Sequence, residues 1–149
     1  MRKLYLLPAL LFLLLTSCQE EEVSPLTLRD QLKGTWVTVA QEQRYYDAAG
    51  QLVHEATPKA KTVFDFNEAN LTTTYSTGTA TICTYTFLER EGKDYLRFTH
   101  NGRMQDFEVT SITGSGMRWQ FRLEKAPYKA GAMLKEADHA TITLSLTRQ

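Results

Sequence analysis

Cysteine and histidine are scarce in this sequence of 149 residues, and neither forms a cluster. Cys18 and Cys83 are too few for a disulfide framework or a zinc site built from several cysteines. The three histidines, His54, His100 and His139, lie far apart, with none at metal-ligand spacing from another. We therefore expect no metal site and no cofactor.

Sequence signatures of catalysis and of nucleic-acid binding are also missing. There is no Gly-x-Ser-x-Gly elbow, and Gly114-Ser115-Gly116 is typical of a turn. Asp106 and Glu108 are spaced like paired carboxylates, but they alternate with apolar residues and are expected to face solvent. The 17 basic and 17 acidic residues give a net charge of +0, without a basic block for nucleic acid. We expect neither an enzyme nor a nucleic-acid partner.

The N-terminal apolar run, residues 4–15, is too short for a transmembrane helix, which needs about 20 residues. It follows a basic Met1-Arg2-Lys3 head, as in a secretory signal peptide. The segment Leu15-Thr16-Ser17-Cys18 resembles a bacterial lipobox. This resemblance implies that residues 1–17 are removed and that Cys18 is acylated on its sulfur and its freed amine. An ordinary secretory signal with a chance cysteine is the alternative.

Residues 18–25 are predicted to form an acylated cysteine and an acidic tether. Each buried methylene contributes about 0.8 kcal/mol, so the two or three acyl chains of a lipoprotein hold firmly. The segment is polar, contains Glu20-Glu21-Glu22 and ends at a proline, so it has too few apolar residues to pack. By resemblance to bacterial lipoprotein sorting, Gln19 after the cysteine favours the outer membrane. The acidic cluster resembles a surface-export signal; a plain solvated spacer is the alternative. We expect a lipid-anchored domain on the periplasmic or cell-surface face.

Residues 26–149 are expected to form one all-β domain with a short N-terminal helix over residues 26–33. Recurrent turn signals separate alternating segments, and Asn101-Gly102 is typical of a type I′ hairpin. Residues 125–139 are expected to be a longer connection, with one helical turn as a possible element. Strands are predicted over residues 36–46, 61–67, 71–76, 79–88, 94–100, 104–112, 117–124 and 140–148. This pattern predicts an antiparallel up-and-down barrel of about eight strands, with a sandwich as the alternative.

The segment Leu32-Lys33-Gly34-Thr35-Trp36 resembles the start of a lipocalin, where a short helix precedes Gly-x-Trp at the opening of the first strand. Bacterial lipoproteins with lipocalin-like domains commonly begin this way. The family's tryptophan plugs the closed end of the barrel, and a basic residue late in the last strand stacks over it. The resemblance therefore implies Trp36 as the plug and Arg148 as its cation–π partner. The family's Thr-Asp-Tyr signature is not found in this chain.

A ligand site is predicted at the opposite end of the barrel. If Trp36 points inward, an alternation of period two also sends Glu42 and Arg44 inward, near the mouth. Tyr75 and Trp119 are predicted to supply aromatic walls. In one alternative a bulge redirects the first strand and places Glu42 and Arg44 in water. In another the aromatic side chains fill the barrel completely.

Two functions follow from these alternatives. The first is a membrane-anchored binding module for a small apolar or amphipathic ligand. The second is a packed barrel that binds another envelope protein, as an inhibitor, immunity protein or accessory subunit. A void of about 300–1,000 Å³ is typical of a ligand pocket, so the barrel interior distinguishes the two.

Overall fold

The computed structural model describes residues 25–59 and 61–149. The expected signal peptide, Cys18 and the tether up to residue 24 lie outside the described residues. Within them, one helix precedes nine strands. The elements are α1 (Pro25–Leu32), β1 (Gly34–Tyr46), β2 (Leu52–Ala56), β3 (Thr62–Phe66), β4 (Asn70–Tyr75), β5 (Ala80–Arg90), β6 (Lys93–His100), β7 (Arg103–Ile112), β8 (Gly116–Ala130) and β9 (Met133–Arg148). No helix in this described part is both long and apolar enough to cross a membrane.

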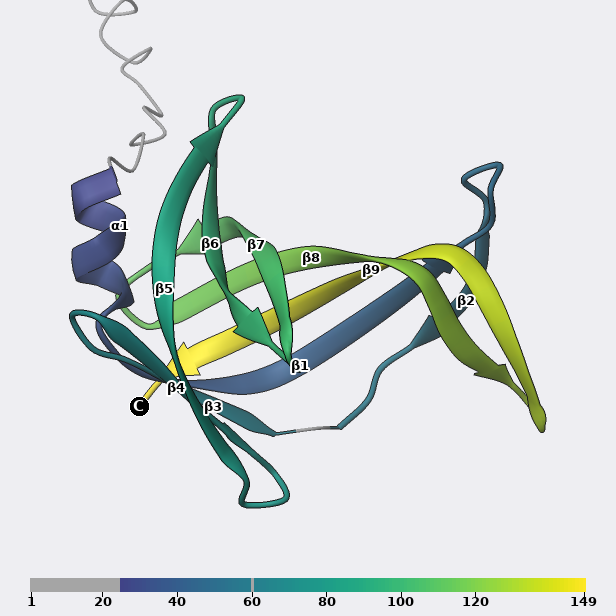
Figure 1. The fold of residues 1–149 in the computed structure, drawn as a ribbon, viewed down its shortest axis with the longest axis horizontal. Coiled ribbons are helices and arrows are strands. Elements are labelled where there is room, and N and C mark those ends of the chain that lie inside the picture. Colours follow the sequence, from purple (N-terminus) through teal and green to yellow (C-terminus); the bar gives the residue numbers. More distant parts are fainter. Residues whose placement is uncertain (1–24, 60) are drawn as a thin grey trace, which may run out of the picture.

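The strands form a closed antiparallel barrel (Figure 1). Each strand from β3 to β9 pairs with its neighbour in the chain, and β1 pairs with both β3 and β9 to close the cylinder. The extra strand, β2, pairs only with the distal part of β1. Closure leaves the eight barrel strands with few unpaired edges. The predicted eight-stranded barrel with a short N-terminal helix is confirmed.

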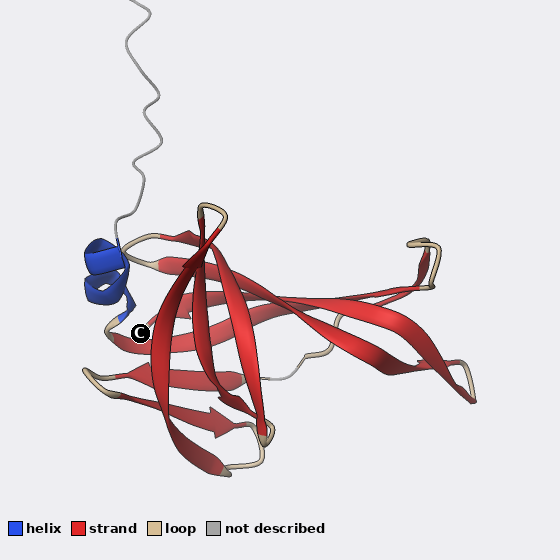
Figure 2. Cartoon of the chain, turned by 45° about the horizontal axis from the view of Figure 1, so that its top comes forward, coloured by secondary structure: helices blue, strands red, loops and turns tan. Residues whose placement is uncertain are grey.

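Two hairpins extend beyond the barrel, on the side away from α1 (Figures 1 and 2). They are formed by β1 with β2, and by the distal parts of β8 and β9. The prediction of a connection over residues 125–139 is wrong, because β8 and β9 remain paired as far as Ala130 and Met133. Lys125 has a φ of 50°, and the buried positions change from odd to even residues there. The alternation of buried and exposed residues therefore changes phase at Lys125, while the pairing of β8 with β9 continues.

The closed end of the barrel is sealed by α1 and Trp36. Leu28 and Leu32 lie four residues apart on one helix face, and both are buried. Gly34 has a φ of 107°, which lets the chain turn from the helix into β1. The Trp36 ring is fully buried, and its Nε1 atom donates a hydrogen bond to the Leu32 carbonyl at 2.8 Å. This end of the barrel is therefore closed to ligands.

The half of the barrel interior next to the closed end is filled by aromatic rings. Phe98 and Phe107 stack with centroids 4.2 Å apart and planes within 2°. Trp119 meets Phe64 edge to face at 4.9 Å and lies 5.3 Å from Phe107. All four side chains are almost completely buried. Offset and edge-to-face contacts of this kind stabilise a core beyond the burial of area alone. These rings therefore leave little open space in the half of the barrel next to the closed end.

Candidate functional site

A cavity of about 250 Å³ lies inside the barrel at the end opposite Trp36. Inward-pointing side chains of β3, β7, β8 and β9 form its apolar wall, because each belongs to the inner face of an alternating strand. These residues are Phe64, Phe107, Phe121, Ile142 and Leu144. An apolar cavity of about 150 Å³ is enough to hold benzene. The volume of about 250 Å³ at this mouth is below the range of about 300–1,000 Å³ typical of a ligand pocket, so the space fits no more than a substituted single ring. We call it the mouth cavity.

Uncharged polar side chains form the other wall of the mouth cavity. They are Gln41, Thr62, Tyr75, His100 and Asn101. The Tyr75 hydroxyl donates a hydrogen bond to Asn101 Oδ1 at 3.3 Å. Asn101 and Gly102 have φ values of 50° and 75°, as the predicted type I′ turn requires. That turn therefore brings an amide from the β6–β7 hairpin to the end of β4.

His100 contributes an imidazole ring to the mouth cavity. Its ring lies within 6.2 Å of the Tyr75 ring and 5.7 Å of the Phe107 ring, measured between centroids. Burial lowers the pKa of His100 below its ordinary value of 6.5, so the neutral imidazole dominates at neutral pH. Its Nδ1 atom is buried and has no hydrogen-bond partner among the described residues. The site thus holds a neutral ring with unused hydrogen-bonding capacity.

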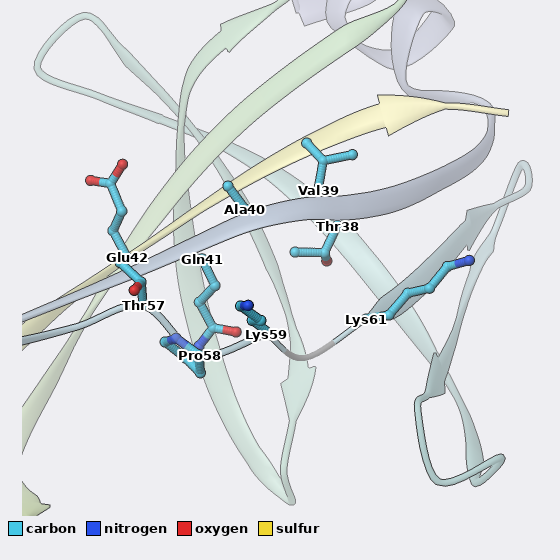
Figure 3. A pocket seen from close by; sticks show the side chains of 9 residues that line it. All are labelled: Thr38, Val39, Ala40, Gln41, Glu42, Thr57, Pro58, Lys59 and Lys61. Atoms are coloured by element: carbon cyan, nitrogen blue, oxygen red, sulfur yellow. The ribbon is translucent and has the colours of Figure 1, made fainter.

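A second space, about 460 Å³ in volume, opens through the side of the barrel beside the mouth cavity (Figure 3). On this side β1 pairs with β3 up to Val37 and with β2 from Gln43, so residues 38–42 have no partner strand there among the described residues. Across the gap lie Pro58 and Lys59, toward which the Gln41 side chain points (Figure 3). Gln41 lines both spaces, so this side groove adjoins the mouth cavity.

The predicted inward orientation of Glu42 and Arg44 is wrong. The β1–β9 register shifts between Thr38 and Ala40, so the intervening residue forms a bulge and the alternation inverts beyond it. The Glu42 side chain is 44% exposed and lies 3.7 Å from Arg118. The Arg44 side chain is 54% exposed and donates to Glu55 at 2.8 Å. Both belong to the outer face, although Glu42 touches the side groove.

The other predicted residues lie in two different parts of the barrel. Tyr75 lines the mouth cavity. Trp119 is fully buried in the aromatic core and does not line the cavity. Trp36 lies at the closed end, with the Arg148 guanidinium 4.6 Å from its ring centroid. The structure therefore brings only Tyr75 of the four predicted ligand-binding residues into the mouth cavity.

Sequence reasoning missed Gln41 and His100. Gln41 faces inward only because of the bulge at position 39, which has no compositional signature. His100 continues the inner face of Leu96 and Phe98. Alternation along β6 was therefore a usable signal for His100.

Asp106 and Glu108 face outward, as their alternation predicts, and both are paired with cations. Asp106 accepts two hydrogen bonds from Arg97, at 2.6 and 2.9 Å, and lies 2.8 Å from Arg90. The hydrogen bond from Arg97 is the main reason that the pKa of Asp106 is lowered. Glu108 pairs with Lys93 at 3.0 Å. Across the described residues, no group of three or more His, Cys, Asp or Glu side chains is placed to hold a metal ion.

No protein-family model matches this sequence, and no curated protein matches it. A solved structure, that of EF1p2_mFAP2b bound to DFHBI, is similar over 80% of this chain and 95% of that chain. The two share 16% sequence identity, with a TM-score of 0.40.

Proposed function

We propose that this protein is a lipid-anchored, lipocalin-like barrel that binds a small apolar or amphipathic ligand in the mouth cavity. The observation that carries the proposal is the contrast within one barrel interior. The half next to the closed end is filled by aromatic rings, whereas about 250 Å³ at the mouth stays open. Apolar walls with a few converging polar groups are typical of small-molecule sites.

The binding energy would come mainly from burial against the apolar wall. Each Å² of apolar surface removed from water contributes about 25 cal/mol. The rings of Phe107 and Phe121 present flat faces or edges to an incoming molecule. Gln41, Tyr75 and His100 would orient it through hydrogen bonds. No residue in this arrangement is assigned a catalytic role.

Acylation of Cys18 would supply the proposed anchor. The position of this anchor relative to the fold would also determine which end of the barrel faces the membrane. The helix that follows the tether packs at the closed end of the barrel. Because α1 begins at Pro25, the tether between Cys18 and the helix consists of residues 19–24. Six residues span at most about 22 Å, so the closed end would stay near the membrane. The mouth would then open toward the aqueous phase, where a ligand can enter. We propose the outer membrane as the location, with the domain on its periplasmic or cell-surface face.

The two extended hairpins favour a second candidate function, the binding of another envelope protein. Leu52 and Val53 are exposed near the β1–β2 turn. Met133 and Leu134 are exposed at the β8–β9 turn, with 62% and 72% of their surface accessible. Exposed apolar side chains grouped at hairpin ends are suited to contact with a partner. An inhibitor, immunity or accessory role would use these ends rather than the cavity.

Native mass spectrometry of the full, lipid-modified protein from its host membranes tests the ligand proposal. We expect a mass beyond protein and acyl chains that disappears on denaturation. Leu144→Phe fills the cavity and should abolish this extra mass, whereas Ile82→Phe, on the outer face, should retain it. A wild-type protein that stays bare, even after incubation with an extract of host metabolites, would contradict ligand binding and favour the partner-binding role.

A further inference from the structure

The mouth cavity has no charged side chain among its lining residues, all of which belong to the described part of the chain. Lys59 and Lys61 are exposed and line the side groove, but they do not line the mouth cavity. An ionised ligand group inside the mouth cavity would therefore lose its hydration without gaining a counter-ion. Because burying an unpaired charge is costly, the cavity favours an uncharged ligand.

His100 offers a single directed hydrogen-bond donor to this space. In a neutral imidazole one ring nitrogen carries the proton and the other accepts. Nδ1 is buried without a hydrogen-bond partner among the described residues. Nε2 is not among the buried side-chain atoms that lack a partner there. Buried N–H groups without an acceptor are rarer than unsatisfied acceptors, so the proton belongs on Nε2. His100 lines the cavity. A ligand there can accept a hydrogen bond from Nε2, because this ring nitrogen is not among the buried atoms that lack a partner.

The surroundings of His100 restrict the shape of that ligand. The rings of Tyr75, Phe107 and Phe121 lie 6.2, 5.7 and 6.0 Å from the imidazole centroid. Aromatic rings prefer offset or edge-to-face neighbours at such separations. Because these aromatic residues also line the cavity, a flat ring bound there has aromatic neighbours to pack against. The cavity volume of about 250 Å³ limits the ligand to one ring system.

We propose that the mouth cavity selects an uncharged, single-ring aromatic molecule whose carbonyl or hydroxyl oxygen accepts a hydrogen bond from His100 Nε2. This inference rests on the proposed ligand-binding function and specifies the chemical class of its ligand. The polar atom of the ligand lies beside His100, and its ring lies against Phe107 and Phe121.

Three matched probes test the proposal by NMR titration of the purified full chain. Acetophenone is neutral and carries an acceptor, cumene has a similar shape without one, and benzoate is charged. The decisive quantity is the cumene Kd divided by the acetophenone Kd, which measures the preference of the cavity for a hydrogen-bond acceptor. Differences between the two probes in nonspecific partitioning are the same for every variant, so they cancel when the ratios of two variants are compared. This ratio should fall about three- to tenfold in His100→Phe, which keeps a ring and removes the donor. His100→Gln keeps a donor and should retain most of the ratio, as should the outer-face control Arg44→Gln.

Benzoate should bind at least about tenfold more weakly than acetophenone. An unchanged ratio in His100→Phe, with saturable binding of both neutral probes, would overturn the role of His100 and leave ligand binding intact. Benzoate binding tighter than acetophenone would overturn the preference for an uncharged ligand. An absence of saturable binding for all three probes would contradict both this inference and the proposed function.

Discussion

Arg148 lies over the indole ring of Trp36, with its Cζ atom 4.6 Å from the ring centroid. The two residues are register partners in the β1–β9 pairing that closes the barrel. The same guanidinium donates hydrogen bonds to the main-chain carbonyls of Lys33, at 3.0 Å, and Gln31. One side chain of the last strand thus joins the helix and the first strand at the closed end.

Arg148→Ala should lower the free energy of unfolding by at least about 3 kcal/mol. The change removes a cation–π contact of about 0.5–2 kcal/mol and hydrogen bonds from a charged donor, each about 1.5–3 kcal/mol. Urea denaturation measures the loss. Arg118→Ala is the control, because Arg118 forms only an exposed 3.7 Å pair with Glu42 and should cost less than about 1 kcal/mol. Equal losses of unfolding free energy in the two variants would show that the contacts of Arg148 do not stabilise the closed end.

Phe107→Ala should destabilise the barrel by about 3–5 kcal/mol, because it removes a buried ring and leaves a cavity beside Phe98 and Trp119. Denaturant unfolding, followed by circular dichroism, measures the effect. Ile82→Ala is the matched control on the outer face, where 72% of the side chain is exposed, and should change stability by less than about 0.5 kcal/mol. A loss below 1 kcal/mol for Phe107→Ala would mean that the core is not packed as described.

Stability should fall as the pH decreases through 6.5, and His100 should be a cause. Burial lowers the pKa of His100 in the folded state, so the unfolded chain takes up this proton first as the pH falls. Stability from this group is therefore fully present above the unfolded pKa of 6.5 and is lost below it. Aspartate protonation acts later, since its ordinary pKa is 3.8.

The free energy of unfolding, measured from about pH 7.5 to pH 5.5, checks this effect. His100→Phe should have a flatter profile than the wild type over this range. Identical slopes in the two proteins would exclude His100 as the source of the pH dependence.

Cys18→Ser should move the protein from the membrane fraction to the soluble fraction. The proposed anchor consists of acyl chains on this cysteine, so their loss removes the attachment. Immunoblots of fractionated host cells measure the distribution, and Cys83→Ser is the matched control that should remain with the membrane. Retention of Cys18→Ser in the membrane, after proof that its signal segment has been removed, would contradict the lipid anchor.

The barrel strands were predictable because each contains a run of residues whose inner face alternates regularly. Along β8, Met117, Trp119 and Phe121 are all buried, as the sequence pattern requires. The prediction failed where the backbone departs from regular geometry. At Lys125, which has a φ of 50°, the buried positions change from odd to even residues, although the strand continues. The short β2 consists largely of exposed residues, and its period-two signal is correspondingly weak.

The candidate site was less predictable, because it depends on one inserted residue. The bulge at Val39 turns Gln41 inward and sends Glu42 and Arg44 outward. Counting in steps of two from Trp36 cannot detect such an insertion, since a β-branched residue also fits a regular strand. Tyr75 lines the mouth cavity, because the β3–β4 hairpin has no bulge and its register is continuous.

A crystal structure of the protein isolated from its own membranes would test the central claim most directly. We predict electron density for a non-protein molecule in the mouth cavity, in contact with His100 and Phe121. Density for ordered water alone, or side chains of the mouth packed together without an intervening molecule, would contradict the assignment of this cavity as a ligand site.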